Sequence, residues 1–273
     1  MNGLGVVETS FIDRHGHLES FGSDITAAVI GATGAIGRAF VETLTSLETV
    51  SRVLALSRHD PRLVASQATW VPIDIEDENS IRTAAETLRA GTGEIHLVIV
   101  ASGILHDGHM LQPEKTWRSL DGKVLERVFR INTIGPALVA KHFLPLLARR
   151  RKSAFAVLSA RVGSISDNRL GGWHAYRASK AALNMLVRNL SIELARINGN
   201  AICVALHPGT VDSRLSEPFQ ANVPEGKLFS PDYAAGRLLA VLDGLGAKQS
   251  GNLFAWGGKR IPFRGVLLDT PLQ

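Results

Sequence analysis

The stretch Gly31-Ala32-Thr33-Gly34-Ala35-Ile36-Gly37 decides the fold, because it joins an apolar run at residues 25–30 to a helical pattern at residues 35–47. A strand, a glycine-rich turn and a helix in this order are typical of a dinucleotide-binding βαβ unit. Glycines permit a tight turn and a close approach to a pyrophosphate, and the helix N-terminus offers free N–H groups to phosphate oxygens. The spacing is G-x-x-G-x-x-G rather than G-x-G-x-x-G, so a purely structural turn is the alternative.

The same alternation continues to the end of the chain. Apolar runs predict strands at residues 25–30, 52–57, 69–73, 96–101, 153–159, 200–207 and 251–256. Helical patterns lie between them, at residues 35–47, 77–90, 174–197 and 231–245, with a broken pair at 116–149. This order predicts one Rossmann-like, doubly wound α/β domain over residues 25–273. Its sheet has seven parallel strands and helices on both faces. Residues 1–24 show no sustained period and are interpreted as an N-terminal extension.

Composition excludes several classes of protein. The 273 residues are 45% hydrophobic, enough for a large core, and no apolar run approaches the roughly 20 residues of a membrane span. The one cysteine, Cys203, excludes an internal disulfide and zinc sites built from several thiolates. His106 and His109 lack a third ligand, so we predict no metal site. Acidic residues interrupt any apolar signal at the N-terminus, and we expect a cytoplasmic protein.

Charge gives no reason to invoke nucleic acid. Thirty basic and 25 acidic residues leave a net charge of +5, which suits an anionic ligand equally well. The densest basic run, residues 149–152, lies at the predicted end of a long helix, where cations complement the helix dipole. We therefore expect no nucleic-acid partner and give this run a structural role.

The end of the second predicted strand indicates which cofactor is used. A site that prefers NAD places Asp or Glu there, whereas this strand ends in Ser57 and Arg58. A guanidinium matches a 2′-phosphate in geometry and charge, and a serine hydroxyl can donate to it. Asp60 is the rival signal. The pattern favours NADP(H) over NAD(H).

The pair Tyr176 and Lys180 is the strongest chemical signal. Four residues apart on a predicted helix, the two side chains share one face. An ammonium favours tyrosinate, so Lys180 is predicted to lower the pKa of Tyr176 from its usual value of about 10. Such a phenol exchanges protons near neutral pH. The motif is short, and its alternative is an ordinary surface pair.

Together with its surroundings, this pair resembles the short-chain dehydrogenase/reductase family over residues 25–257. The closest likeness is to the branch of C-factor-type signalling proteins and sniffer-type carbonyl reductases. The motifs that carry it are the glycine-rich turn, residues 159–168, Gly171-Gly172-Trp173, residues 176–184, Pro208-Gly209-Thr210-Val211 and the tail at residues 250–262.

The resemblance implies roles for individual residues. Tyr176 would be the catalytic acid/base, Lys180 would tune it and hold the nicotinamide ribose, and Asn132 would support a water-linked proton relay. Asp74 and the following Ile75 would contact the adenine. The expected cofactor-binding residues are Gly31, Thr33, Gly34, Ala35, Ile36, Gly37, Ser57, Arg58, Asp74, Ile75, Ala101, Ser102, Gly103, Tyr176, Lys180, Pro208, Gly209, Thr210 and Val211.

The catalytic serine is where the chain departs from the family. Its usual position, three residues before Gly163, holds Ala160. Ser159 lies one residue earlier and is taken as the catalytic candidate on the assumption that the strand end twists, with Ser164 as its rival. The Asn-Asn-Ala-Gly that follows the family's fourth strand reads Val100-Ala101-Ser102-Gly103 here, without either asparagine.

These features predict a reductase that transfers a hydride from NADPH to a small ketone or aldehyde. Trp173 and Phe219 are expected to flank the substrate, under a lid at residues 215–229. The resemblance also implies a homodimer or homotetramer. A nucleotide-binding signalling protein with little turnover is the alternative.

Overall fold

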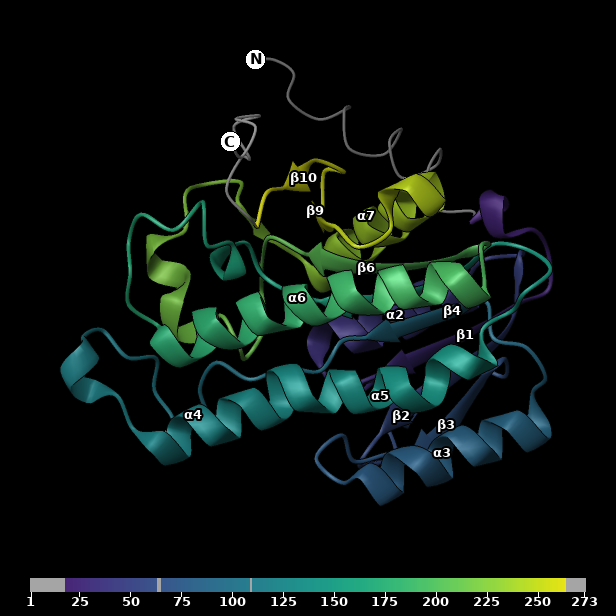
Figure 1. Ribbon diagram of the computed structural model, residues 1–273, viewed down its shortest axis with the longest axis horizontal. Coiled ribbons are helices and arrows are strands. Elements are labelled where there is room, and N and C mark those ends of the chain that lie inside the picture. Colours follow the sequence, from purple (N-terminus) through teal and green to yellow (C-terminus); the bar gives the residue numbers. More distant parts are fainter. Residues whose placement is uncertain (1–17, 63–64, 109, 264–273) are drawn as a thin grey trace, which may run out of the picture.

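The computed structural model describes residues 18–62, 65–108 and 110–263. One eight-stranded sheet runs through it in the order β10-β9-β6-β5-β4-β1-β2-β3 (Figure 1). The strands of this sheet are β1 (Ile25–Ile30), β2 (Val50–Ser57), β3 (Ala68–Pro72), β4 (Leu97–Val100), β5 (Ser153–Leu158), β6 (Ala201–His207), β9 (Leu253–Ala255) and β10 (Arg260–Ile261). Two further short strands, β7 (Thr210–Val211) and β8 (Leu228–Phe229), pair with each other.

The sheet corrects the predicted strand number. The seven predicted strands are all present and pair in parallel, and β10 adds an eighth, antiparallel strand at the edge. The predicted strand at 251–256 ends at Ala255, because the chain reverses at Gly258, which has a φ of +79°. The tail therefore forms a hairpin rather than a single strand.

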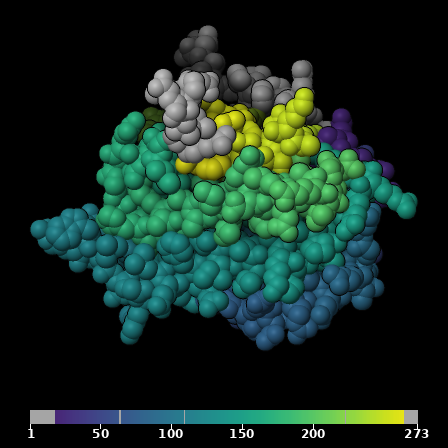
Figure 2. Space-filling model, viewed as in Figure 1, coloured from purple at the N-terminus to yellow at the C-terminus, as the bar shows by residue number. Residues whose placement is uncertain are grey.

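Helices cover both faces of the sheet. They are α2 (Ala35–Thr45), α3 (Glu78–Gly91), α4 (Gly122–Phe129), α5 (Gly135–Phe143), α6 (His174–Ile197) and α7 (Pro231–Gly244), with a π-helical turn at Arg130–Ile134 between α4 and α5. In Figure 1, α3, α5 and α6 lie in front of the sheet, and α6 is the green band that crosses the face in Figure 2. No helix in the described part of the chain is long and apolar enough to cross a membrane.

Alternating residues of each strand build two cores. In β5, for example, Phe155 and Val157 pack with α3, α5 and α6, whereas Ala154 and Ala156 pack with α2 and α7. Strands buried on both faces explain why the sequence shows continuous apolar runs rather than alternation. In the sheet, β1 lies between β2 and β4, so the connections that start from β1 run in opposite directions along the sheet. In sheets of this kind, ligands bind at the carboxyl ends of the strands, at the point where the direction changes.

The residues just before β1 belong to the folded body. Leu18 and Phe21 are buried against α7, although residues 18–24 were expected in the extension. Lys152 holds this segment: its ammonium donates to the hydroxyl of Ser20 at 2.7 Å and to the last carbonyls of α7. The basic run at residues 149–152 is therefore structural, as predicted, but Lys152 caps α7 rather than the helix that precedes the run. Residues 1–17 and 264–273, also covered by the predicted boundaries, lie outside the described residues.

Candidate active site

The glycine-rich turn joins β1 to α2. Gly31 has a φ of +90°, and the N–H groups of Gly31 and Ala32 donate to the carbonyl oxygen of Leu56 at 2.8 and 3.1 Å. A Cβ atom at Gly37 would overlap the carbonyl oxygen of Gly31, so α2 packs against the turn only with glycine there. Gly34 caps α2 without a side-chain hydrogen bond, which leaves the first N–H groups of the helix free of any side-chain partner. The turn therefore has the geometry that phosphate binding requires, and the phosphate contact itself stays a prediction.

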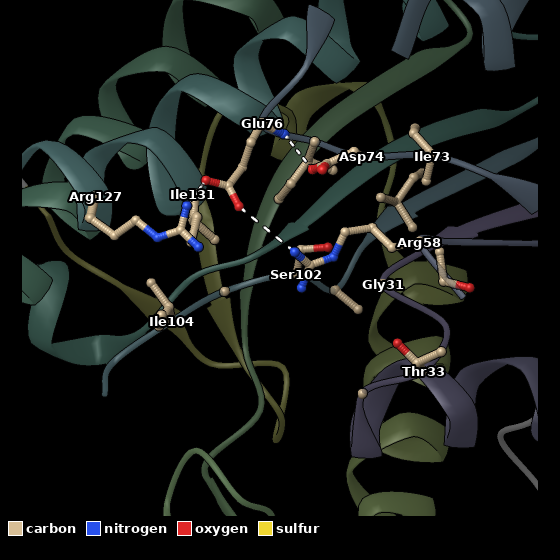
Figure 3. Close-up of a pocket in the computed structure, with 16 residues that line it drawn as sticks. Gly31, Thr33, Arg58, Ile73, Asp74, Glu76, Ser102, Ile104, Arg127 and Ile131 are labelled. Atoms are coloured by element: carbon tan, nitrogen blue, oxygen red, sulfur yellow. Dashed lines mark hydrogen bonds and ion pairs between the residues drawn. The ribbon is translucent and has the colours of Figure 1, made fainter. Parts of the chain in front are cut away.

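A pocket of about 280 Å³ opens beside this turn, at the carboxyl ends of four neighbouring strands (Figure 3). Ten of the predicted cofactor-binding residues line it: Gly31, Thr33, Gly34, Ser57, Arg58, Asp74, Ile75, Ala101, Ser102 and Gly103. The other nine are not among its lining residues: Ala35, Ile36, Gly37, Tyr176, Lys180 and residues 208–211. The sequence prediction missed Glu76, Ile104, Arg127 and Ile131, which also line it. Arg127 and Ile131 lie one helical turn apart in the segment that leads to Asn132. This spacing is the sequence signal that could have identified both residues as part of the site.

The end of β2 differs from expectation in one respect. The Ser57 hydroxyl donates to the carbonyl oxygen of His59 at 2.7 Å, so its proton is already used and is not free for a phosphate. The Arg58 side chain is 60% exposed, and its Nη1 lies 4.0 Å from a Glu76 oxygen. The rival acid, Asp60, accepts from the backbone N–H of Arg62 and stabilises a local turn. Arg58 is thus the cationic group at this tip, and it lies within ion-pair distance of Glu76.

Three of the four predicted catalytic residues, Tyr176, Lys180 and Asn132, lie close together just after the end of β4. Lys180 is buried, and its Nζ donates to the carbonyl oxygen of Leu158 at 2.9 Å and lies 5.8 Å from the ring centre of Tyr176. A Cβ atom at Gly103 would lie 3.4 Å from Oδ1 of Asn132 and 3.5 Å from Nζ of Lys180, so both polar groups lie close to the backbone of Gly103. Tyr176, Lys180 and Asn132 are therefore brought together, as the resemblance implied.

Asn132 is fixed by the π-helical turn. Its side chain is fully buried, with Oδ1 accepting from the N–H of Ile104 and Nδ2 donating to the carbonyl of Ile104, both at 2.8 Å. Nδ2 also donates to the Ser179 hydroxyl at 3.1 Å. The wider π turn places this amide between α6 and the chain that follows β4.

Burial sets the charge states of the catalytic pair. It raises the pKa of Tyr176 to about 12 and lowers the pKa of Lys180 to about 8. The sequence analysis predicted a lowered pKa for Tyr176, because it placed the Lys180 ammonium nearby. It could not show that the phenol is buried. In this structure the phenol is held in its protonated form.

Both serine candidates serve structural contacts. The Ser159 hydroxyl donates to Oδ1 of Asn184 on α6 at 2.8 Å. The Ser164 hydroxyl donates to the carbonyl of Pro262 and accepts from the N–H of Asp167. Neither serine forms a hydrogen bond with Tyr176, Lys180 or Asn132 in the described chain, so the expected twist of the strand end does not turn Ser159 toward them.

A buried carboxylate caps the catalytic helix. Both oxygens of Glu114, at 3.3 and 3.2 Å, accept from the N–H of Ala175, the residue before Tyr176. The Glu114 carbonyl accepts from Trp173, which is itself left-handed with a φ of +51°. The sequence prediction missed Glu114, because nothing local relates it to a helix 61 residues away.

An aromatic chain leads from the phenol to the predicted lid. The rings of Trp173 and Tyr176 meet edge to face with centres 6.3 Å apart, and Trp173 contacts Phe219 at 4.8 Å. Phe219 in turn meets His106 at 5.9 Å, and Nε2 of His106 lies 2.9 Å from the carbonyl oxygen of Arg214. The loop after β4 and the segment around residues 214–219 therefore contact each other and reach Tyr176 through Trp173. His109 lies outside the described residues.

Residues 208–211 contact the end of the predicted lid segment, residues 215–229. Thr210 and Val211 form β7, which pairs with β8 at the end of the lid. Gly209 has a φ of +82°, and a Cβ atom there would lie 2.6 Å from the Phe229 ring. This packing joins the turn after β6 to β8, while the expected cofactor contact of residues 208–211 stays a prediction.

Comparison with known proteins gives consistent results. The family model for short chain dehydrogenases matches residues 25–224. The crystal structure of an NADPH-bound carbonyl reductase from chicken fatty liver is 30% identical, with a TM-score of 0.73, and covers 88% of this chain and 99% of its own.

Two curated relatives carry different names. The C-signal protein of Myxococcus xanthus is 40% identical over 51% of this chain and 78% of its own length. A 1-hydroxy-2-glutathionyl-2-methyl-3-butene dehydrogenase from a Rhodococcus species is 30% identical over 69% of this chain and 78% of its own.

Proposed function

The chain belongs to the short-chain dehydrogenase family, and we propose that it is an NADP(H)-dependent oxidoreductase that reduces a ketone or aldehyde. The observation that carries the proposal is the convergence of Tyr176, Lys180 and Asn132 at the end of β4, next to a pocket that begins at the glycine-rich turn. The likeness to an NADPH-bound carbonyl reductase at 30% identity supports it.

The pocket fits a dinucleotide phosphate. The turn leaves backbone N–H groups at the start of α2, and the Gly31–Gly37 approach leaves no space for side chains there. Arg58 would hold a 2′-phosphate, and Asp74 and Ile75 would border the adenine, which makes NADP(H) the preferred cofactor over NAD(H). When bound, the cofactor supplies the hydride.

The protein then supplies the proton. With a hydride supplied to the carbonyl carbon, the Tyr176 phenol would donate its proton to the carbonyl oxygen, which takes up the C=O π electrons, to give the alcohol. A pKa of about 12 keeps the phenol protonated before the step, which suits reduction. The ammonium of Lys180 stabilises the tyrosinate left behind, and Asn132 holds the loop after β4 in place.

Replacement of Tyr176 tests the proposal. Tyr176→Phe is expected to lower kcat for carbonyl reduction by about 10²–10⁴-fold, the usual contribution of a general acid, while NADPH binding persists. Tyr233→Phe is the matched control, since Tyr233 is the chain's only other tyrosine and packs against Phe229 and Trp256. A Tyr176→Phe protein that folds and turns over like the unaltered chain would rule out this assignment.

A second function is favoured by one observation. Alanine stands at residue 160, where the family has its catalytic serine, and the C-signal protein is 40% identical over half of the chain. The alternative is a nucleotide-binding signalling protein with little turnover. NADPH consumption against a panel of ketones, aldehydes and quinones, measured beside NADPH affinity, separates the two: tight binding without turnover would favour signalling.

Assembly and location complete the proposal. We expect a homodimer or homotetramer formed through the long helices, because α6 carries three exposed apolar side chains, Met185, Ile192 and Ile197. Sedimentation velocity measures this directly, and a monomer at all concentrations would contradict it. A reducing compartment such as the cytoplasm suits a chain whose only cysteine, Cys203, is buried and free.

A further inference from the structure

Two arginines share one carboxylate at the mouth of the cofactor pocket. In Figure 3, Glu76 lies between Arg58, at the end of β2, and Arg127, on α4. One oxygen of Glu76 is 4.0 Å from Nη1 of Arg58, and the other accepts a hydrogen bond from Arg127. All three side chains line the pocket. The proposed phosphate-binding cation therefore already faces an anion of the protein.

Glu76 cannot easily move away from this position. Its backbone N–H donates to Oδ1 of Asp74 at 3.0 Å, which fixes the turn after β3. Its side chain is 19% exposed, against 60% for Arg58 and 49% for Arg127. The carboxylate is thus the most enclosed member of the cluster, and the two guanidinium groups approach it from the solvent side.

A fixed carboxylate beside Arg58 opposes a phosphate in two ways. It competes for the guanidinium, and it repels the charge of a 2′-phosphate at a distance of a few ångströms. Arg127 weakens both effects, because a carboxylate paired with its own arginine holds Arg58 and repels an incoming anion less strongly. NAD(H) has no 2′-phosphate, so its binding does not depend on whether Glu76 is neutralised.

We propose that Arg127 is a specificity-determining residue, which secures preference for a 2′-phosphorylated dinucleotide by neutralising Glu76 and so releasing Arg58. The inference rests on the proposed use of NADP(H). Arg127 acts through Glu76 rather than by replacing Arg58. An ordinary exposed ion pair between Glu76 and Arg127 would leave the ratio of NADPH to NADH affinity unchanged.

A double-mutant cycle tests the coupling. The dissociation constants of NADPH and NADH are measured by fluorescence titration for the unaltered chain, Arg127→Gln, Glu76→Gln and the double variant. Arg127→Gln is expected to weaken NADPH binding about five- to tenfold and NADH binding less than about twofold. Glu76→Gln is expected to tighten NADPH binding about three- to tenfold. In the double variant, the Arg127 effect disappears.

Lys123→Gln is the control, since it removes the same charge one turn earlier on α4, where Lys123 is exposed. Lys123→Gln is expected to leave the ratio of NADPH to NADH affinity unchanged. If Lys123→Gln and Arg127→Gln change this ratio equally, the effect comes from net charge alone and the inference is overturned. An Arg127→Gln variant that weakens both dinucleotides equally would overturn it too, because Arg127 would then contact the shared adenosine.

The two proposals fail in different ways. If the unaltered chain binds neither dinucleotide, or prefers NADH, the proposal that the protein uses NADP(H) is wrong. If the unaltered chain prefers NADPH and this preference survives in Arg127→Gln, the cofactor proposal stands and the role of Arg127 is refuted.

Discussion

Replacing Ser159 by alanine decides which position beside the phenol supports catalysis. The change leaves Oδ1 of the buried Asn184 without its 2.8 Å donor, which costs about 1–3 kcal/mol of the free energy of unfolding. In a chain of this size, that lowers the melting temperature by roughly 2–12 °C. Loss of a donor to a developing alkoxide would instead lower kcat by about 10²–10³-fold. Because the hydroxyl is engaged with Asn184, we expect Ser159→Ala to lower stability and to change kcat by less than about threefold.

Ala160→Ser is the matched variant. Residue 160 is extended, with φ −144° and ψ 148°, so its Cβ points to the opposite side of the chain from that of Ser159. A hydroxyl there is expected to raise kcat about ten- to a hundredfold by orienting the carbonyl. Carbonyl-dependent NADPH consumption and melting curves are measured for both variants. A loss of kcat of about a hundredfold in folded Ser159→Ala, with no gain in Ala160→Ser, would refute this reasoning.

Three further variants and one pH profile test other parts of the structure. Gly37→Ala is expected to cost more than about 3 kcal/mol of stability, because its Cβ overlaps the preceding turn. Gly34→Ala, where a Cβ has 3.4 Å of space, is expected to fold but to bind NADPH more weakly, as melting and titration would show. Lys152→Met is expected to cost about 1–3 kcal/mol in denaturant unfolding, through three lost hydrogen bonds. The exposed control Arg150→Met should cost less than about 0.5 kcal/mol. Burial lowers the pKa of Lys180 to about 8, so its charge is present below that pH and lost above it. A kcat/KM profile for reduction should fall above pH 8, and a level profile would contradict the role of this ammonium.

The sequence predicted the fold well because long buried strands leave a strong signal. Each of the seven parallel strands overlaps its predicted range, and the strand predicted at residues 96–101 is found at Leu97–Val100. The predicted helix start at Asp77 is confirmed, since its carboxylate accepts from the N–H of Asn79. The two-residue strand β10 was not predicted from the sequence, because its pairing depends on a turn at Gly258 and not on hydrophobic periodicity.

The chemistry of the site was less accessible from the sequence, for two physical reasons. Side-chain direction at the end of a strand depends on local twist, and the Ser159 hydroxyl faces Asn184 instead of the phenol. Pairs such as Glu76 with Arg127 are 51 residues apart, and only the fold brings them together. The motif did locate Tyr176, but burial, a property of the whole structure, reversed the predicted direction of its pKa shift.

The hydrogen bonds around the phenol also indicate how its proton is replaced. The amide of Asn132 is fully engaged: its oxygen accepts from Ile104, and its nitrogen donates to the carbonyl of Ile104 and to a hydroxyl of α6. It has no donor left for a relay. A charged Lys180 carries three protons, of which the carbonyl of Leu158 accepts one. We therefore expect the proton that restores Tyr176 to pass through the ammonium rather than through the amide side chain, which links the chain after β4 to α6.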